Sequence, residues 1–126
     1  MTCIARTFAA STHETYNAWL DPRVMHRWMF LAGRSEIVEI DLQPHTGGSF
    51  SIIERCDDGD IDHHGVFGAV VKPQHLTLVL EAACPVDVDL VSVPEGCVLT
   101  LTYNGDPLAN WRGMLDRLDA VLRGLA

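Results

Sequence analysis

Hydrophobic and polar residues alternate along most of the chain, with the period of two that is typical of β-strands. The first clear case is Val38, Ile40 and Leu42, which alternate with acidic residues. The same spacing predicts further sets of side chains that share one face of a strand: Phe50, Ile52 and Glu54; Leu76, Leu78 and Leu80; Val86, Val88 and Leu90; and Leu99, Leu101 and Tyr103. With a short strand at residues 4–8 and a long one at residues 61–72, the pattern predicts seven strands.

Two short helices are expected between the first strand and the second. Ser11 is a good N-cap, and Glu14 three residues later completes a capping box for a helix that continues through Trp19. Asp21 and Pro22 then end this helix, because proline is tolerated only in the first turn of a helix. The same two residues begin a second helix that extends to about residue 29.

Towards the end of the chain, the spacing of hydrophobic residues changes from that of a strand to that of a helix. Trp111, Leu115, Leu118, Leu122 and Leu125 recur at the spacing of one helix face, which predicts an amphipathic helix. An antiparallel sheet with one apolar face must bury that face, and this helix is the available cover. The predicted fold class is therefore α+β, with a single domain over residues 1–126.

Several segments, taken in order, resemble one known family. They include a helix interrupted by Asp-Pro between two tryptophans, and they lie at residues 6–11, 18–28, 40–44 with 47–50, 65–67 with 70–73, and 99–103 with 111 and 115–118. This set resembles the START-like (SRPBCC) helix-grip superfamily, and within it the branch named after the activator of heat shock protein 90 ATPase. The resemblance implies a seven-stranded sheet that curls around the long C-terminal helix and leaves a cavity between them.

The chain departs from the family pattern in two loops and at one side chain. The loop at residues 29–34 is short where the family commonly has an aromatic-Gly-Pro element, and the loop at residues 105–110 is also brief. The family often has a histidine where Tyr103 stands, so the resemblance implies that Tyr103 keeps a polar group at this position.

Charge and composition exclude several partners. A formal net charge of −8 with scattered basic residues argues against binding of nucleic acid, and the same repulsion disfavours an anionic membrane surface. No apolar run approaches the roughly 20 residues of a membrane span, and the N-terminus lacks a secretory pattern, so a cytoplasmic protein is expected. The four cysteines have no CxxC spacing and are expected to be free thiols.

No metal ion or cofactor is expected. The densest cluster of candidate ligands extends from Asp57 to His64, but its spacing is not that of an EF-hand, and the adjacent His63 and His64 point to opposite faces of a strand. An exposed acidic hairpin with Gly59 at its turn is the favoured interpretation. The sequence also lacks the P-loop, GxGxxG and GxSxG motifs.

A ligand site between the sheet and the last helix is expected to use the side chains that both periodicities turn inward. Glu54 and Tyr103 lie on otherwise apolar faces, and convergent polar groups in an apolar pocket are typical of small-ligand sites. The candidate ligand-binding residues are Trp28, Phe50, Ile52, Glu54, His64, Leu78, Leu101, Tyr103, Trp111 and Leu115. The alternative that these side chains fill a solid core stays open at this stage.

Three functions are compatible with this pattern. The first is binding of a hydrophobic small molecule, by a monomer or a homodimer. The second is an aromatase or cyclase type of enzyme that uses Tyr103 with Glu54 or His64 for acid–base chemistry. The third is an interaction module that acts on a chaperone ATPase, as the name of the branch suggests. No nucleophile–base pair follows from the spacing, so no catalytic residue is assigned and binding is favoured over catalysis.

Overall fold

The computed structural model describes residues 2–30, 35–80, 84–104 and 111–124. The predicted order of strands and helices is confirmed. The strands are β1 (Thr2–Phe8), β2 (Glu36–Leu42), β3 (Ser49–Cys56), β4 (Gly59–Val71), β5 (His75–Leu80), β6 (Cys84–Val93) and β7 (Gly96–Tyr103). The helices are α1 (Thr12–Asn17), α2 (Pro22–Met25) and α3 (Trp111–Leu122).

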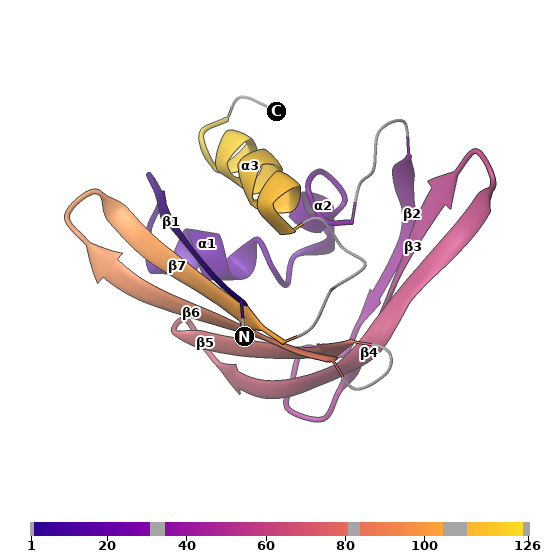
Figure 1. Cartoon of the computed structure of the whole chain (residues 1–126), viewed down its shortest axis with the longest axis horizontal. Helices are drawn as coiled ribbons and strands as arrows, with labels where there is room; N and C mark the ends of the chain where they lie inside the picture. Colours follow the sequence, from indigo (N-terminus) through magenta and orange to yellow (C-terminus); the bar gives the residue numbers. More distant parts are fainter. Residues whose placement is uncertain (1, 31–34, 81–83, 105–110, 125–126) are drawn as a thin grey trace.

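The strands form one antiparallel sheet of seven strands in the spatial order β1-β7-β6-β5-β4-β3-β2. The sheet is bent into a cradle, with β1 and β7 towards one rim and β2 and β3 at the other (Figure 1). Helices α1, α2 and α3 lie on the concave side of this cradle (Figure 1). This is the α+β arrangement that the sequence pattern predicts, and the curvature of the sheet around a C-terminal helix is the one that the family resemblance implies.

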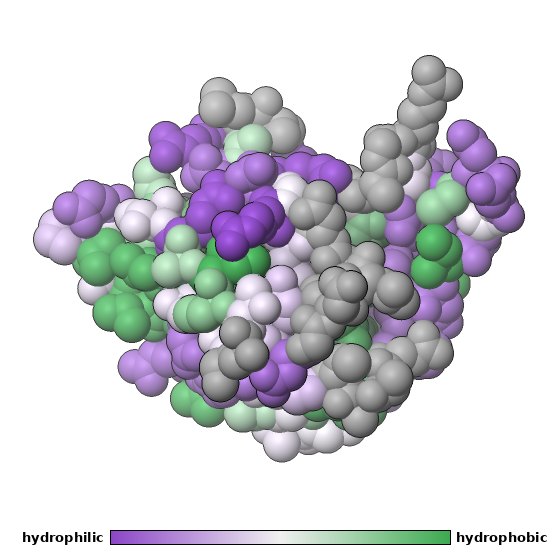
Figure 2. All heavy atoms as spheres, viewed as in Figure 1, coloured by the Kyte–Doolittle hydropathy of each residue, from purple (hydrophilic) through white to green (hydrophobic). Residues whose placement is uncertain are grey.

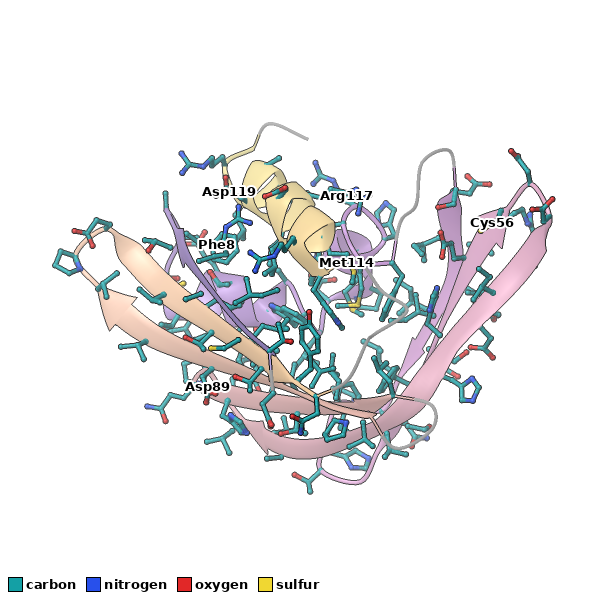
Figure 3. All side chains as sticks on the ribbon, in the orientation of Figure 1. Phe8, Cys56, Asp89, Met114, Arg117 and Asp119 are labelled. Atoms are coloured by element: carbon teal, nitrogen blue, oxygen red, sulfur yellow. The ribbon has the colours of Figure 1, made fainter. Side chains whose placement is uncertain are left out.

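Helix α3 covers the concave face with one apolar stripe. The buried members of the stripe are Trp111, Met114, Leu115 and Leu118. Met114 lies on the side of α3 that faces the sheet, Asp119 lies on the opposite side, and hydrophilic side chains gather over the outer face of the helix (Figures 2 and 3). Leu122 is half-buried, and Leu125, the last predicted member, lies outside the described residues.

The ends of α1 and α2 follow the predicted caps. Ser11 Oγ accepts a hydrogen bond from the Glu14 amide at 3.1 Å, which confirms the N-cap of α1. Asp21 Oδ1 accepts one from the Arg23 amide at 3.0 Å, with Pro22 in the first turn of α2.

Both helices are shorter than predicted, because each continues as a tight turn. The Trp19 amide donates to the Tyr16 carbonyl at 3.0 Å, and the Trp28 amide donates to the Met25 carbonyl at 3.2 Å. These bonds between residues three apart wind the chain more tightly than an α-helix does. The turns carry Trp19 and Trp28 to the inside of the cradle, where both are buried.

The strict alternation predicted for β2 is wrong at one position. Val38 is 39% exposed, and Ile37 is the residue that packs against the core. The pairing of β2 with β3 shifts register between Ile37 and Glu39, so a β-bulge inserts one residue and turns Val38 outward. Ile40 and Leu42 pack against the core, as predicted.

The α3 stripe generates a stability prediction. Leu118→Ala removes a fully buried side chain between α3 and the sheet and should cost about 2–5 kcal/mol of unfolding free energy. Leu122→Ala, one turn later and half-buried, should cost clearly less. Urea denaturation of the two variants measures both values, and equal losses would show that α3 does not cover the sheet in this register.

Candidate functional site

Aromatic side chains from three separate segments pack together beneath α3. The Trp19 ring meets the Trp28 ring edge-on at a centroid distance of 4.8 Å, and it stacks on the Trp111 ring at 6.0 Å. The Phe30 ring meets the Trp111 ring at 5.9 Å. All of these side chains are buried. We call Trp19, Trp28, Phe30 and Trp111 the aromatic cluster.

The tryptophans of the aromatic cluster differ in their hydrogen bonding. Trp28 Nε1 donates to the Ala18 carbonyl at 3.1 Å. Trp19 Nε1 and Trp111 Nε1 are buried and have no hydrogen-bond partner among the residues that the structure describes. A buried N–H donor without an acceptor costs about 1–3 kcal/mol. Two such donors in stacked rings indicate a place that an acceptor atom would stabilise.

A polar pair on the sheet lies against this cluster. Glu54 on β3 is 3% exposed, and its Oε1 is 2.9 Å from Nε2 of His63 on β4. In the pairing of these strands His63 is opposite Ile52, which is buried on the concave side. Glu54 and His63 therefore face the interior together, and the buried carboxylate has a hydrogen-bonded partner there.

The pKa of the Glu54 carboxyl is lowered despite its burial. Burial by itself raises this pKa, but hydrogen bonds from Ser35 and His63 and the charge of His63 lower it, with a further hydrogen bond from Cys56, and together they outweigh burial. Glu54 is therefore ionised at neutral pH and accepts the hydrogen bond. His63 then carries its proton on Nε2, the nitrogen that donates to Glu54.

Phe30 joins the aromatic cluster to the polar pair. Its ring stacks on the His63 imidazole at a centroid distance of 4.2 Å, with 7° between the planes. Its backbone has a φ of 54°, a left-handed conformation that is rare for a bulky residue and costs about 1–3 kcal/mol. The Phe30 amide donates to Met114 Sδ of α3 at 3.0 Å, which holds the strained residue in place.

The interior next to Phe30 is almost filled. A void of about 10 Å³ remains, which is room for at most one water molecule. The side chains around it are Trp19, Met25, Met29, Phe30, Leu42, Phe50, Ile52, Phe67 and Leu78. An organic molecule therefore enters this space only if one of the lining side chains moves.

A larger hollow lies on the surface beside the turn between α1 and α2. It has a volume of about 450 Å³, and its charged side chains are Asp21 and Lys72. The Asp21 carboxylate is already bonded to the Arg23 guanidinium, which lowers its pKa. Since the hollow is open and the Asp21 carboxylate already accepts hydrogen bonds from Arg23, the interior is the better candidate site.

Most of the predicted ligand-binding residues face the interior. Those that line the void are Phe50, Ile52 and Leu78, and those that are buried in the surrounding core are Trp28, Leu101, Trp111 and Leu115. Gly65 leaves the space for Phe50, since a Cβ there would lie 2.9 Å from its ring. Tyr103 is half-buried at the end of β7 and packs against the core without lining the void.

His64 does not belong to this interior set, and its assignment as a ligand-binding residue is corrected. Its side chain is 48% exposed and its Nδ1 is 3.8 Å from Asp62 Oδ1, on the outer face of β4. The alternation of β4 explains this, because Phe67 is buried and residues two and four positions before it share its face. His63 is the histidine that faces the interior and bonds Glu54.

Sequence reasoning missed further residues of the site, notably Trp19, Phe30 and His63. The position of His63 could have been found by counting back from Phe67 in steps of two. Trp19 and Phe30 lie in turns that follow α1 and α2, where no periodic pattern assigns a face. Of the two short loops predicted at residues 29–34 and 105–110, residues 31–34 of the first and the whole of the second lie outside the described residues.

The described residues also include the remaining histidine, cysteine and acidic side chains that the sequence analysis considered. Among them, no group of three or more histidine, cysteine or acidic side chains is arranged to hold a metal ion. None of the described helices is long and apolar enough to cross a membrane. Cys3, Cys56 and Cys97 are free thiols, as predicted. Gly59 has a φ of 125° in the acidic hairpin, which also agrees with the prediction.

The fold is shared with several solved bacterial proteins. An AHSA1-like protein from Aeromonas hydrophila is 24% identical with a TM-score of 0.86, and the match covers 99% of this chain and 94% of that chain. A protein from Nitrosomonas europaea is 14% identical with a TM-score of 0.85, and the match covers 98% and 94%. A protein from Rhodobacter sphaeroides is 20% identical with a TM-score of 0.85, and the match covers 98% and 92%. At these identities the similarity establishes the fold alone.

A comparison of the sequence with family models identifies the family. Residues 9–123 match the model of a family described as activator of Hsp90 ATPase homolog 1-like protein. A search of the curated proteins finds no match to the chain.

The polar pair generates a pH prediction. Glu54 has a lowered pKa in the folded protein, so its ionisation stabilises the fold above the ordinary pKa of a glutamate and this stabilisation is lost as the pH falls through the lowered value. Glu54→Gln should cost about 1–3 kcal/mol at pH 7, and the gap to the unmodified protein should close as the pH falls below about 4.5. Urea denaturation across this range measures it.

Glu39→Gln is the matched control, since Glu39 is an exposed glutamate on the neighbouring β2. It should leave the unfolding free energy within about 0.5 kcal/mol at every pH. A gap for Glu54→Gln that stays constant down to pH 3 would contradict the ionised pair.

Proposed function

The chain belongs to the family of activator of Hsp90 ATPase homolog 1-like proteins, and within this fold we propose that it binds a small, planar, largely apolar molecule between the sheet and α3. The ligand takes the place of the Phe30 ring. The observation that carries the proposal is a pair of buried indole N–H groups, those of Trp19 and Trp111, that have no hydrogen-bond partner among the described residues and lie next to a strained residue that fills the space.

Phe30 is suited to yield its place to a ligand. Its ring has the contacts that a flat ligand would make, face to face with His63 at 4.2 Å and in a T-shaped contact with Trp111 at 5.9 Å. Its left-handed backbone stores about 1–3 kcal/mol that is released when the residue leaves this conformation. Outward movement of Phe30 therefore costs less than the loss of its apolar contacts alone would suggest.

The surroundings define the chemistry of the ligand. The side chains around the void are apolar, and each Å² of apolar ligand surface that they cover contributes about 25 cal/mol before the costs of association. A hydrogen-bond acceptor on the ligand would satisfy Trp19 Nε1 or Trp111 Nε1, which have no partner among the described residues. The preferred ligand is therefore a flat, mostly hydrocarbon molecule with at least one acceptor atom.

A matched pair of probes tests this preference. Quinoline and naphthalene have nearly the same shape, but quinoline has a ring nitrogen that accepts a hydrogen bond. Quinoline should bind about fivefold more tightly, which corresponds to one hydrogen bond of about 1 kcal/mol. In ¹⁵N-resolved NMR titrations, quinoline should shift the indole N–H signal of Trp19 or Trp111 and leave that of Trp28, which is bonded to Ala18, nearly unchanged.

Equal affinity of the two probes, or a shift confined to Trp28, would contradict the proposed role of the Trp19 and Trp111 N–H groups. If neither probe binds even at the limit of its solubility, the interior is a solid core and the binding proposal fails.

A glycine at position 30 should improve binding. Phe30→Gly removes the ring that a ligand must displace, and glycine adopts a φ of 54° without strain. Naphthalene should bind the variant at least about tenfold more tightly than the unmodified protein, because the open state no longer has to be populated first. Fluorescence or NMR titration gives both dissociation constants.

Leu90→Ala is the matched control. It also truncates a buried apolar side chain, but Leu90 on β6 does not line the void. If Leu90→Ala increases naphthalene binding as much as Phe30→Gly does, the ligand enters any loosened core and the assignment to Phe30 is wrong.

A further inference from the structure

Arg117 on α3 has a guanidinium nitrogen that is shielded from water. Its side chain is half-buried, and its Nη1 atom is buried without a hydrogen-bond partner among the residues that the structure describes. Proteins rarely leave such a group without an acceptor, because burying a donor alone is costly and burying a charged one costs more. Arg117 Nη1 therefore marks a position that an anion would stabilise.

The acidic side chains of α3 are paired with other arginines. Asp116 Oδ1 lies 2.8 Å from Nη1 of Arg6 on β1. Asp119 Oδ1 lies 3.0 Å from Nε of Arg123, one turn later on α3. Neither carboxylate supplies a partner to Arg117 Nη1, and no other acidic side chain among the described residues forms an ion pair with it.

Arg117 lies on the flank of α3 that is next to the proposed ligand. Met114, one turn earlier on this helix, accepts a hydrogen bond through Sδ from the Phe30 amide at 3.0 Å. Residues three apart are neighbours on a helix surface, and side chains lean towards the N-terminus of the helix, so the Arg117 side chain leans back towards Met114. Figure 3 shows both residues on the side of α3 that is turned towards the β2–β3 rim, with Asp119 on the other side.

The donors around the place of Phe30 differ in what they select. The indole N–H groups of Trp19 and Trp111 are neutral and suit any acceptor atom. A guanidinium is charged, and its parallel N–H groups match the two oxygens of a carboxylate. One guanidinium also balances one negative charge, which fits a monocarboxylate better than a phosphate group with a charge of about −1.5 to −2.

We propose that the ligand is a planar aromatic carboxylic acid, bound as its carboxylate, and that Arg117 recognises the charged end. The ring takes the place of Phe30 between His63 and Trp111, and the carboxylate extends along α3 to the guanidinium. Glu54 is the buried acid that would repel such a ligand, and its Oε1 is already bonded to His63 at 2.9 Å. The inference rests on the proposed binding function, since the ring must first displace Phe30.

A matched pair of probes isolates the charge of the ligand. 2-Naphthoate and 2-naphthamide have nearly the same shape and share the ring and a carbonyl oxygen, but only naphthoate is charged at pH 7. The unmodified protein should bind naphthoate about tenfold more tightly, which corresponds to about 1.4 kcal/mol. NMR titration gives both dissociation constants. Naphthoate should also displace quinoline, because both rings occupy the place of Phe30.

Variants of α3 assign the preference to one residue. Arg117→Met keeps the apolar stem and removes the guanidinium, so naphthoate and naphthamide should bind it with equal affinity, and the affinity for naphthamide should stay within about twofold. Arg117→Lys keeps the charge and should keep part of the preference. Arg112→Met is the matched control, because it removes one positive charge from an exposed position of the same helix and should keep the tenfold preference.

The stability of Arg117→Met is an independent readout. Replacing a buried donor that has no acceptor by an apolar group of similar shape is nearly neutral or stabilising, so the urea midpoint should stay the same or rise. A clearly lower midpoint would show that a partner within the folded chain holds the guanidinium, and it would overturn the assignment of Arg117 to a ligand.

The failure of this inference differs from the failure of binding itself. If naphthamide binds but naphthoate binds no more tightly, or the preference survives in Arg117→Met, the role of Arg117 is overturned and the binding function stands. Naphthoate that binds without displacing quinoline overturns it as well. If naphthoate, naphthamide and quinoline all fail to bind, both proposals fail. A preference that is lost in Arg117→Met and kept in Arg112→Met supports both.

Discussion

Burial of the concave apolar face of the sheet is the constraint on which the rest of the structure depends. One face of every strand must be covered, and α3 with its single stripe covers part of it. The turns after α1 and α2 fill the remaining space with Trp19, Trp28 and Phe30. Packing three indole rings in one place buries three N–H donors, and the Ala18 carbonyl satisfies one of them, that of Trp28.

A buried carboxylate in the same interior adds a second requirement. Glu54 is stable inside the cradle because His63 donates to it and because Ser35 and Cys56 also lower its pKa. His63 Nε2 forms the hydrogen bond with Glu54, and His63 Nδ1 has no hydrogen bond among the described residues. Phe30 covers that imidazole in a strained conformation. A buried apolar face, indole donors without a partner among the described residues, a buried pair of Glu54 and His63 and a strained cover thus occur at one point of the fold, which is why we assign function to it.

The sequence predicts this fold well because both periodicities are regular. Spacing of two turned Phe50, Ile52, Leu78 and Leu101 inward, and helical spacing did the same for Trp111 and Leu115. Where regularity ends, the prediction fails for physical reasons. A bulge in β2 moved Val38 outward, and tight turns ended α1 and α2 before Trp19 and Trp28.

The site is harder to predict than the fold, because its decisive contacts join residues far apart in sequence. The stacking of Phe30 on His63 depends on a left-handed residue in a turn, and no pattern of hydrophobicity encodes that conformation. The choice between His63 and His64 depended on the register of one strand, since a shift of one residue exchanges the two faces. Glu54 could be placed from its strand, whereas His64 was assigned to the site in place of its neighbour His63.

Measuring the contact between Phe30 and His63 tests the binding proposal most directly, because the ligand must replace the Phe30 ring. In the free protein, nuclear Overhauser effects should connect the ring protons of Phe30 with those of His63, as expected for centroids 4.2 Å apart. At saturation with quinoline these effects should vanish, and new ones should connect quinoline with His63 and Trp111. Persistence of the contacts between Phe30 and His63 while quinoline is bound would contradict the account.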